Sequence, residues 1–310
     1  MQPGEMDRIA SAIGAAVLEW RTLAGGFSHE TCLLTLDDGP VVARFGGPDP
    51  AIEAAVMAAA SRHVPVPHVD LVIPAADGSR PAMLLEYVEG RPLSDVLAGP
   101  ELGAAESRDL GAVVGRAAAG IGAVTFDRPG FFADGQLSVA AERPWSQQLP
   151  EFARTCMDKT PDERVEQHVR AAWADLCAAH APALTAIDDQ ARLAHADMNP
   201  KNVLVTRVGS SWRVDAVLDW EFSFSGCPYG DAANMARFAA DYPPDFIDGF
   251  LSAFAEHQPA DLPLAGDWLY LGRVLDMFAL SDLVSRAVGH QVADRAAEVI
   301  KLWVADGVPL

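Results

Sequence analysis

Lysine is scarce in this chain of 310 residues, which contains only Lys159, Lys201 and Lys301. Basic residues as a class are outnumbered: 23 Lys and Arg stand against 43 Asp and Glu, a formal net charge of −20. This balance argues against a nucleic-acid or anionic-membrane partner, because phosphate groups require a positively charged face. The acidic excess is compatible with attraction of a small cationic molecule, or it serves only to keep the chain in solution.

Cysteine is also rare, and its four residues form no C-x-x-C pair: they are Cys32, Cys156, Cys177 and Cys227. Such scattered cysteines are not typical of a zinc site or a disulfide framework. No run approaches ~18 uninterrupted apolar residues, so we expect no membrane span. The first residues include acids and no apolar run of signal length. We therefore expect a soluble, cytoplasmic protein and leave its oligomeric state open.

The first part of the chain mixes one helical pattern, over 5–18, with short β-rich runs separated by turn residues. Asp49 and Pro50 are typical of a helix start and predict a helix over 50–62. Strands are predicted at 19–23, 32–36, 41–45, 69–73 and 82–88.

After Pro92 the hydrophobic period is mostly 3.6, which is typical of helices. Helices are predicted near 94–98, 104–124, 145–157, 162–180, 229–240, 245–256, 267–288 and 291–305. A pair of strands at 201–206 and 213–218 interrupts them. We predict an α+β fold: residues 1–90 form a small antiparallel β-sheet lobe with a hinge at 86–92, and residues 91–310 form a larger, mainly helical lobe.

The strongest chemical signal is a loop, His195-Ala196-Asp197-Met198-Asn199-Pro200-Lys201-Asn202, followed by the predicted hairpin and then Asp219-Trp220-Glu221. A hairpin brings its two ends together, so Asn202 and Asp219 should be neighbours, with Asp197 beside them. Two carboxylates and an amide oxygen are hard ligands that suit Mg²⁺ and its substrate phosphates. They also suit phosphoryl transfer, in which one carboxylate takes the proton of the attacking hydroxyl.

H-x-D-x4-N followed by a hairpin and D-W-E resembles the aminoglycoside phosphotransferase family, antibiotic kinases related in fold to protein kinases. The stretch 199–202 with 219–221 is similar to the branch that phosphorylates cyclic peptide antibiotics of the viomycin and capreomycin type. The resemblance implies a protein-kinase-like two-lobe fold and a catalytic base at Asp197. It also implies Mg²⁺ ligands at Asn202 and Asp219, and a His195 that holds the loop through backbone contacts.

The resemblance places a nucleotide, ATP or GTP, against the small lobe. The expected phosphate loop spans residues 25–31 and includes Gly26, Phe27, Ser28 and His29. Kinases of this type also need a cation on the third strand, held by a carboxylate on the next helix. No lysine occurs before Lys159. We therefore assign these parts to Arg44 and Glu53, since arginine also binds phosphate and carboxylate.

The segment 84–90 resembles the adenine-binding hinge of the family, in which the carbonyl of Glu86 and the amide of Val88 would meet the purine edge. These would be main-chain contacts, so the side chains at 86 and 88 carry little information. The expected nucleotide site therefore runs from this hinge to the phosphate loop.

Acidic residues of the large lobe are candidates for binding a cationic acceptor. The candidates are Asp241, Asp245 and Asp276, with Asp248 and Asp282 as further ones. Asp276 lies in a stretch that is apolar almost all round, which is typical of a buried helix, and a charge there must be paired or functional. Arg273, three residues earlier, is the alternative partner of Asp276.

The leading hypothesis is an ATP- and Mg²⁺-dependent O-phosphotransferase that acts on a hydroxyl of a small cationic molecule. An aminoglycoside or a tuberactinomycin-type peptide, with antibiotic resistance as the outcome, fits best. The alternatives are a macrolide kinase, a metabolite kinase of the choline, homoserine or methylthioribose type, and a nucleotide-binding pseudokinase. Asp231 has a structural role, as an N-cap or as a brace of the loop, and the roles of Lys201 and Glu221 stay open.

Overall fold

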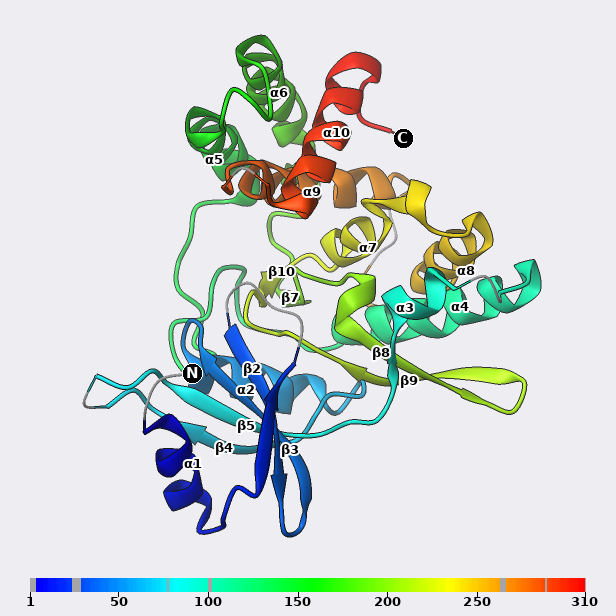
Figure 1. Ribbon diagram of the computed structural model, residues 1–310. Coiled ribbons are helices and arrows are strands. Elements are labelled where there is room, and N and C mark those ends of the chain that lie inside the picture. The colour runs from blue at the N-terminus through cyan, green and yellow to red at the C-terminus, as the bar shows by residue number, and fades with distance from the viewer. Residues whose placement is uncertain are drawn as a thin grey trace.

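The protein has two lobes, a β-sheet lobe that contains the N-terminus and a larger helical lobe that contains the C-terminus (Figure 1). The computed structural model describes residues 4–23, 29–76, 78–99, 102–262, 266–287 and 289–309. The α+β, protein-kinase-like prediction is confirmed. The sheet ends at Glu86 and the first helix of the large lobe begins at Leu93.

Five antiparallel strands form the sheet of the small lobe, in the order β1-β2-β3-β5-β4. The strands are β1 (Glu19–Thr22), β2 (His29–Leu36), β3 (Gly39–Gly46), β4 (Val69–Ile73) and β5 (Ala82–Glu86). Successive side chains of a strand point to opposite faces. Leu34, Phe45 and Leu84 accordingly belong to one buried cluster, whereas Met83 and Leu85 belong to the main core.

Each face of the sheet has its own helix. Helix α1 (Glu5–Ile13) adds Ile9 to the smaller cluster, and α2 (Pro50–Ala60) adds Val56 and Met57 to the main core. The prediction that the first helix runs to residue 18 is wrong, because Gly14 adopts a left-handed conformation (φ 67°) that ends it. Helix α2 starts as predicted, with the Asp49 carboxylate accepting from the Ala51 amide at 2.9 Å.

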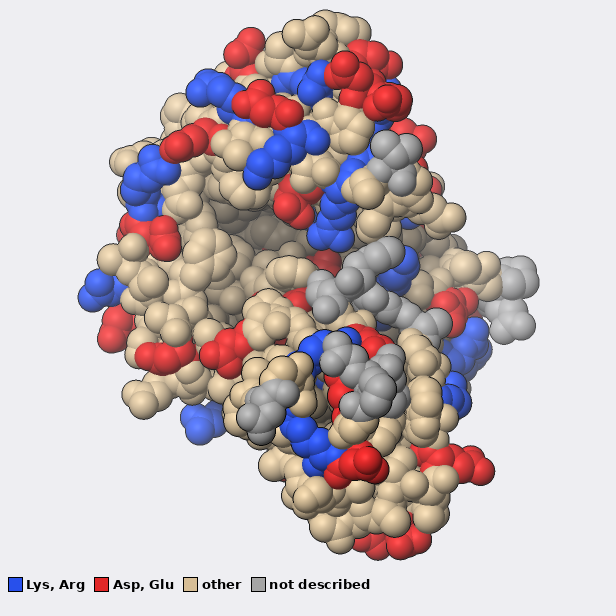
Figure 2. Space-filling model, turned by 60° about the vertical axis from the view of Figure 1, so that its left-hand side comes forward, with Lys and Arg blue, Asp and Glu red and all other residues tan. Residues whose placement is uncertain are grey.

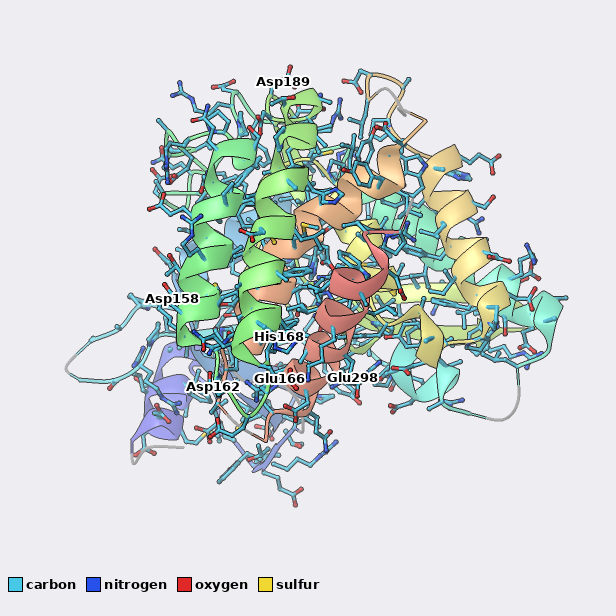
Figure 3. The ribbon with its side chains drawn as sticks, turned by 90° about the horizontal axis from the view of Figure 1, so that it is seen from above. Asp158, Asp162, Glu166, His168, Asp189 and Glu298 are labelled. Carbon is cyan, nitrogen blue, oxygen red and sulfur yellow. The ribbon has the colours of Figure 1, made fainter. Side chains whose placement is uncertain are left out.

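Helices make up most of the large lobe. They are α3 (Leu93–Leu97), α4 (Ala104–Ile121), α5 (Trp145–Lys159), α6 (Gln167–His180), α7 (Tyr229–Ala236), α8 (Pro244–Glu256), α9 (Trp268–Val284) and α10 (Gln291–Asp306). Helices α4 and α8 pack with their backbones close together, since a Cβ atom at Gly111 would lie 2.1 Å from the carbonyl oxygen of Phe246. Seen from above, α5 and α6 lie side by side, with Asp158 on α5 and His168 on α6 (Figure 3).

Short strands position the loops between these helices. Strands β6 (Arg91–Pro92), β8 (Val203–Val208) and β9 (Ser211–Val217) form one sheet, and β7 (Arg192–Ala194) pairs with β10 (Phe224–Gly226). The hairpin β8–β9 was predicted, whereas the three-residue strands β7 and β10 are too short to show a hydrophobic period.

All four cysteines are free and buried. Within the described ranges, no helix combines the length and the apolar character needed to cross a bilayer. One side of the molecule is hollowed between the lobes, and both acidic and basic side chains lie at the rim of this hollow (Figure 2).

Candidate active site

Asp197 lies in the loop between β7 and β8, and its two carboxylate oxygens are held in place from within that loop. Asn202 Nδ2 donates to Oδ2 at 2.8 Å, and Asn199 Nδ2 donates to Oδ1 at 2.9 Å. Burial and then the negative charge of Asp219 raise the pKa of Asp197 to about 6. The carboxylate is thereby oriented, and its proton affinity is higher than that of an ordinary aspartate.

Asp231 and His195 brace this loop. The Asp231 carboxylate accepts from the amides of His195 and Ala196 at 2.9 and 2.8 Å. Asp231 lies inside the first turn of α7, which begins at Tyr229, so the N-cap alternative is wrong and its carboxylate serves the loop. Ala196 needs this support because it adopts a left-handed backbone (φ 66°).

The ring of His195 connects the loop that carries Asp197 to the segment that follows β9. Its Nε2 lies 2.9 Å from the carbonyl oxygen of Leu218, and its Nδ1 accepts from the Asp197 amide at 3.2 Å. The ring also packs on Trp220, with centroids 4.6 Å apart. One nitrogen must donate and the other must accept, so the neutral imidazole fits this position.

The hairpin brings Asn202 and Asp219 to the same end, as the sequence suggested. Val203 pairs with Val217, and the Leu218 amide donates to the carbonyl oxygen of Asn202 at 2.8 Å. Asp219 itself has a left-handed backbone (φ 66°), which turns the chain immediately after β9.

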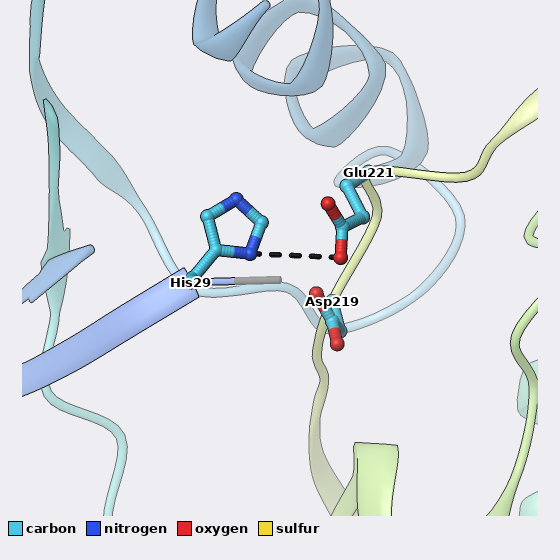
Figure 4. A group of neighbouring side chains, drawn as sticks. All are labelled: His29, Asp219 and Glu221. Carbon is cyan, nitrogen blue, oxygen red and sulfur yellow. Dashed lines mark ion pairs between the residues drawn. The ribbon is translucent and has the colours of Figure 1, made fainter. Parts of the chain in front are cut away.

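Several metal-ligating groups meet beside this turn. His29, Asp219 and Glu221 each offer one ligand atom, and these atoms lie within 4.8 Å of one another (Figure 4). The carboxylate oxygens of Asp219 and Glu221 are donors of the kind that Mg²⁺ prefers. Asn202, at the other end of the hairpin, donates through Nδ2 to Asp197, and its role as a metal ligand stays a prediction. The residues present therefore fit a divalent cation.

The guanidinium group of Arg44 reaches from β3 to both sides of the cleft. NH1 donates to Glu53 Oε1 at 2.5 Å and NH2 donates to Asp219 Oδ1 at 2.6 Å. Arg44 and Glu53 are 8% and 4% exposed, and Glu53 also accepts from the Trp220 amide at 3.2 Å. The structure thus brings together the cation and the carboxylate that the sequence assigned to each other.

His29 begins β2 and is the one member of the expected phosphate-loop set that can be described. Gly26, Phe27 and Ser28 lie outside the described residues. His29 Nδ1 is 2.8 Å from Arg44 NH2 and 3.5 Å from Glu221 Oε1. Burial and the positive charge of Arg44 lower the pKa of His29 to about 4, so the ring is neutral at pH 7.

The expected hinge follows the central part of the sheet. Glu86 is the last residue of β5, and Val88 lies in the irregular segment between β5 and β6. The Glu86 carboxylate accepts from the His68 amide at 3.1 Å. The purine contacts of these two residues stay a prediction.

The acids expected to bind a cationic acceptor all have arginine partners. Asp276 accepts from Arg237 at 2.8 and 2.5 Å, a partner that the sequence analysis did not name. The other pairs are Asp241 with Arg295, Asp245 and Asp248 with Arg108, and Asp282 with Arg286. A role of these acids in substrate binding stays a prediction.

Arg237 was missed by the sequence reasoning. It follows α7, is buried with Asp276, and its positive charge acts to lower the pKa of Asp197. A lone arginine within the apolar stretch AANMARFAA was the available signal, because such a charge requires a buried partner.

Comparisons with known proteins identify the family and the fold of the chain. The family model described as "Phosphotransferase enzyme family" matches residues 19–265, whereas a search of curated proteins found no match. The solved structure of aminoglycoside phosphotransferase APH(4)-Ia in a ternary complex with AMP-PNP and hygromycin B is 18% identical, with a TM-score of 0.73 and 100% of both chains covered.

Two further solved structures share the fold. Macrolide 2'-phosphotransferase MphH from Brachybacterium faecium is 19% identical with a TM-score of 0.61, over 96% of this chain and 98% of that one. Aminoglycoside 2'-phosphotransferase IIIa, in complex with GDP, is 15% identical with a TM-score of 0.68, over 96% and 95%. Since the family model spans most of the sequence, the chain belongs to the phosphotransferase enzyme family.

Proposed function

We propose that the protein is a nucleoside-triphosphate-dependent kinase that transfers the γ-phosphate to a hydroxyl of a small cationic antibiotic. The observation that carries this proposal is the cluster of Asp197, Asp219 and Arg44 at the cleft between the lobes. It combines an oriented base, a metal-ligating carboxylate and a phosphate-binding cation, which are the parts that phosphoryl transfer requires.

Asp197 is the catalytic base. Its carboxylate accepts the proton of the acceptor hydroxyl while the hydroxyl oxygen forms a bond to the γ-phosphorus. The bond between that phosphorus and the bridging oxygen breaks, and the electron pair leaves with the nucleoside diphosphate. Asn199 and Asn202 hold the carboxylate so that little reorganisation is needed at the moment of transfer.

Asn202 and Asp219 would hold Mg²⁺, which neutralises charge on the phosphates when it is bound. Arg44 binds the non-transferred phosphates with its planar fork, while Glu53 fixes the position of the guanidinium group. Glu86 and Val88 offer main-chain groups to the purine base of the nucleotide. AMP-PNP in one structural neighbour and GDP in another support a nucleotide at this cleft without deciding between ATP and GTP.

An antibiotic acceptor is supported by the neighbours, one of which holds hygromycin B and another of which is a macrolide 2'-phosphotransferase. The net charge of −20 favours a cationic acceptor. Expression in a sensitive bacterium should then raise the inhibitory concentration of the antibiotic that is phosphorylated.

The test is an acceptor screen with Mg-ATP and Mg-GTP, and products identified by mass. Aminoglycosides, tuberactinomycin-type peptides, macrolides and the metabolites choline, homoserine and methylthioribose form the panel. We expect turnover of an antibiotic, lost by about 10²–10⁴-fold in Asp197→Asn and retained in Asp158→Asn, an exposed control on α5. Turnover of a metabolite alone, or undiminished turnover in Asp197→Asn, would contradict the proposal.

A further inference from the structure

A cavity of about 220 Å³ lies between the start of α2 and the loops of the large lobe. Neither the predicted hinge nor Asp197 contributes to its described lining, whereas His29, Glu53 and Glu221 of the phosphate and metal groups do. The lining residues are His29, Gly46, Pro48, Asp49, Pro50, Ile52, Glu53, Phe131, Phe132, Glu221, Phe222 and Ser223. It therefore uses both lobes.

The charges around this cavity favour a cation. Three of its lining residues are acidic, Asp49, Glu53 and Glu221, and the described lining contains no lysine or arginine. Arg44, next to it, is one positive charge. Burial acts to lower its pKa, but three carboxylates, those of Glu53, Asp219 and Glu221, raise it above its ordinary value. The summed formal charge of Arg44, Glu53, Asp219 and Glu221 is 1 − 3 = −2, so a further positive charge would be attracted.

The N-terminus of α2, which borders the cavity, does not make the cavity favourable for an anion. A helix N-terminus attracts anions through its free amides. Here Pro50 has no amide hydrogen, and the Ala51 amide donates to the Asp49 carboxylate. The Ile52 and Glu53 amides donate to the Asp49 carbonyl oxygen, so the first turn offers an anion little.

Three phenylalanines, Phe131, Phe132 and Phe222, also line the cavity. Phe131 and Phe222 are 48% and 43% exposed, so their rings are accessible to a bound molecule. Phe131 is also fixed in position, because its ring contacts Trp145 and Phe224 at centroid distances of 5.5 and 5.8 Å. An exposed ring beside a carboxylate suits a cation that carries its own apolar surface, because the ring face attracts the charge and covers the apolar part.

The cavity adjoins the reacting groups. Glu221 follows Asp219 by two residues, and its carboxylate lies beside His29 and Asp219 in Figure 4. Ser223, another lining residue, lies 3.5 Å through its hydroxyl from the carbonyl oxygen of His195 in the catalytic loop. A molecule anchored in the cavity is thus next to the loops that carry both Asp197 and Asp219.

We propose that this cavity binds an ammonium or guanidinium group attached to an apolar ring of the acceptor, with Glu221 and Asp49 attracting the charge and Phe131 and Phe222 covering the ring. Its assignment to the acceptor rests on the proposed function. The acceptor is then an amphipathic, ring-bearing cation. This differs from a polycation bound only by the acids of the large lobe, which already have arginine partners.

The binding experiment uses two small probes with the same phenyl ring and opposite charge, phenethylammonium and phenylacetate. Dissociation constants are measured by protein-observed NMR on the full chain without nucleotide. We expect phenethylammonium to bind and phenylacetate not to bind. Equal binding of the two probes, or no binding of phenethylammonium, would overturn the proposal.

Substitutions then locate the probe. Glu221→Gln and Phe131→Ala should each weaken phenethylammonium binding by about 3–10-fold, the size of one exposed cation–π or ion contact. Asp49→Asn keeps the helix cap and should weaken phenethylammonium binding by a smaller factor. This variant still tests the proposal if Glu221→Gln or Phe131→Ala fails to fold. Glu151→Gln and Phe152→Ala are matched controls outside the lining and should bind as the unchanged protein does. If the controls lose as much affinity as Glu221→Gln, the probe binds elsewhere.

The final step separates this proposal from the proposed function. Phenethylammonium should inhibit competitively against whichever acceptor the screen identifies. Probe binding without any transfer would contradict the kinase assignment alone. Transfer that phenethylammonium does not inhibit competitively would contradict the acceptor assignment of the cavity alone.

Discussion

Arg44 and Asp219 form a direct contact between the lobes, with NH2 donating to Oδ1 at 2.6 Å. The other terminal nitrogen of the same guanidinium group donates to Glu53 at 2.5 Å. One side chain of the sheet lobe therefore holds the helix α2 and the turn after β9 at once. A lysine has a single nitrogen on a flexible stem and would not present this planar fork.

Replacing Arg44 by lysine should impair the enzyme although the charge is kept. A charge-assisted hydrogen bond contributes about 1.5–3 kcal/mol, so loss of one corresponds to a fall in kcat/KM for the nucleotide of about 10–100-fold. Arg44→Ala should be worse than Arg44→Lys. Initial rates against nucleotide concentration provide the measurement, and Arg116→Lys on the exposed face of α4 is the control. Equal kcat/KM in Arg44→Lys would show that the fork is not needed.

Metal binding should depend on the two ends of the hairpin. Asp219→Asn removes a charged oxygen ligand and Asn202→Ala removes an amide oxygen, so both should raise the Mg²⁺ concentration needed for half-maximal rate. Mn²⁺ binding, followed by electron paramagnetic resonance with nucleotide present, gives a readout independent of turnover. Chelation should abolish transfer and added Mg²⁺ should restore it. Unchanged Mn²⁺ affinity in both variants would place the metal elsewhere.

The sequence predicted those parts of the site that lie close together along the chain. It also predicted those for which an element offers only one residue of the required charge. The alternation of residues in β8 and β9 gave the hairpin, which brings Asn202 and Asp219 together. Arg44 and Glu53 were the only suitable cation and carboxylate on their elements. The pairing of Asp276 with Arg237 could not be predicted in this way, because it depends on how α9 packs beside α7. Tertiary packing, rather than spacing along one helix, decides which buried charges meet.

The buried pair of Arg237 and Asp276 should contribute strongly to stability. Their side chains are 6% and 3% exposed, so Asp276→Ala leaves a buried guanidinium group without its main counter-charge. Breaking such a pair costs about 3–5 kcal/mol, measured as the free energy of unfolding in urea. Asp282→Ala breaks an exposed pair with Arg286 and should cost less than about 1 kcal/mol. Similar losses in the two variants would contradict the importance of burial.

The protein should lose stability in acid partly through His195. Burial lowers the pKa of His195 from 6.5 to about 4, so between these values the unfolded chain binds a proton that the folded chain does not. The stabilising contribution is therefore complete above about pH 6.5 and is lost as the pH falls toward 4. A shift of this size corresponds to at most about 3 kcal/mol. Protonation would also remove the Nδ1 acceptor of the Asp197 amide.

The measurement is the free energy of unfolding in urea at several pH values between 4 and 7, for the unchanged protein and for His195→Asn. The variant should be less stable at pH 7, and its stability should fall less steeply with acid, because it lacks the group that takes up the proton. His68→Asn, at an imidazole that is 77% exposed, should keep the original slope. If His195→Asn keeps that slope too, the proton uptake belongs to other groups, among them His29, whose pKa is also lowered to about 4.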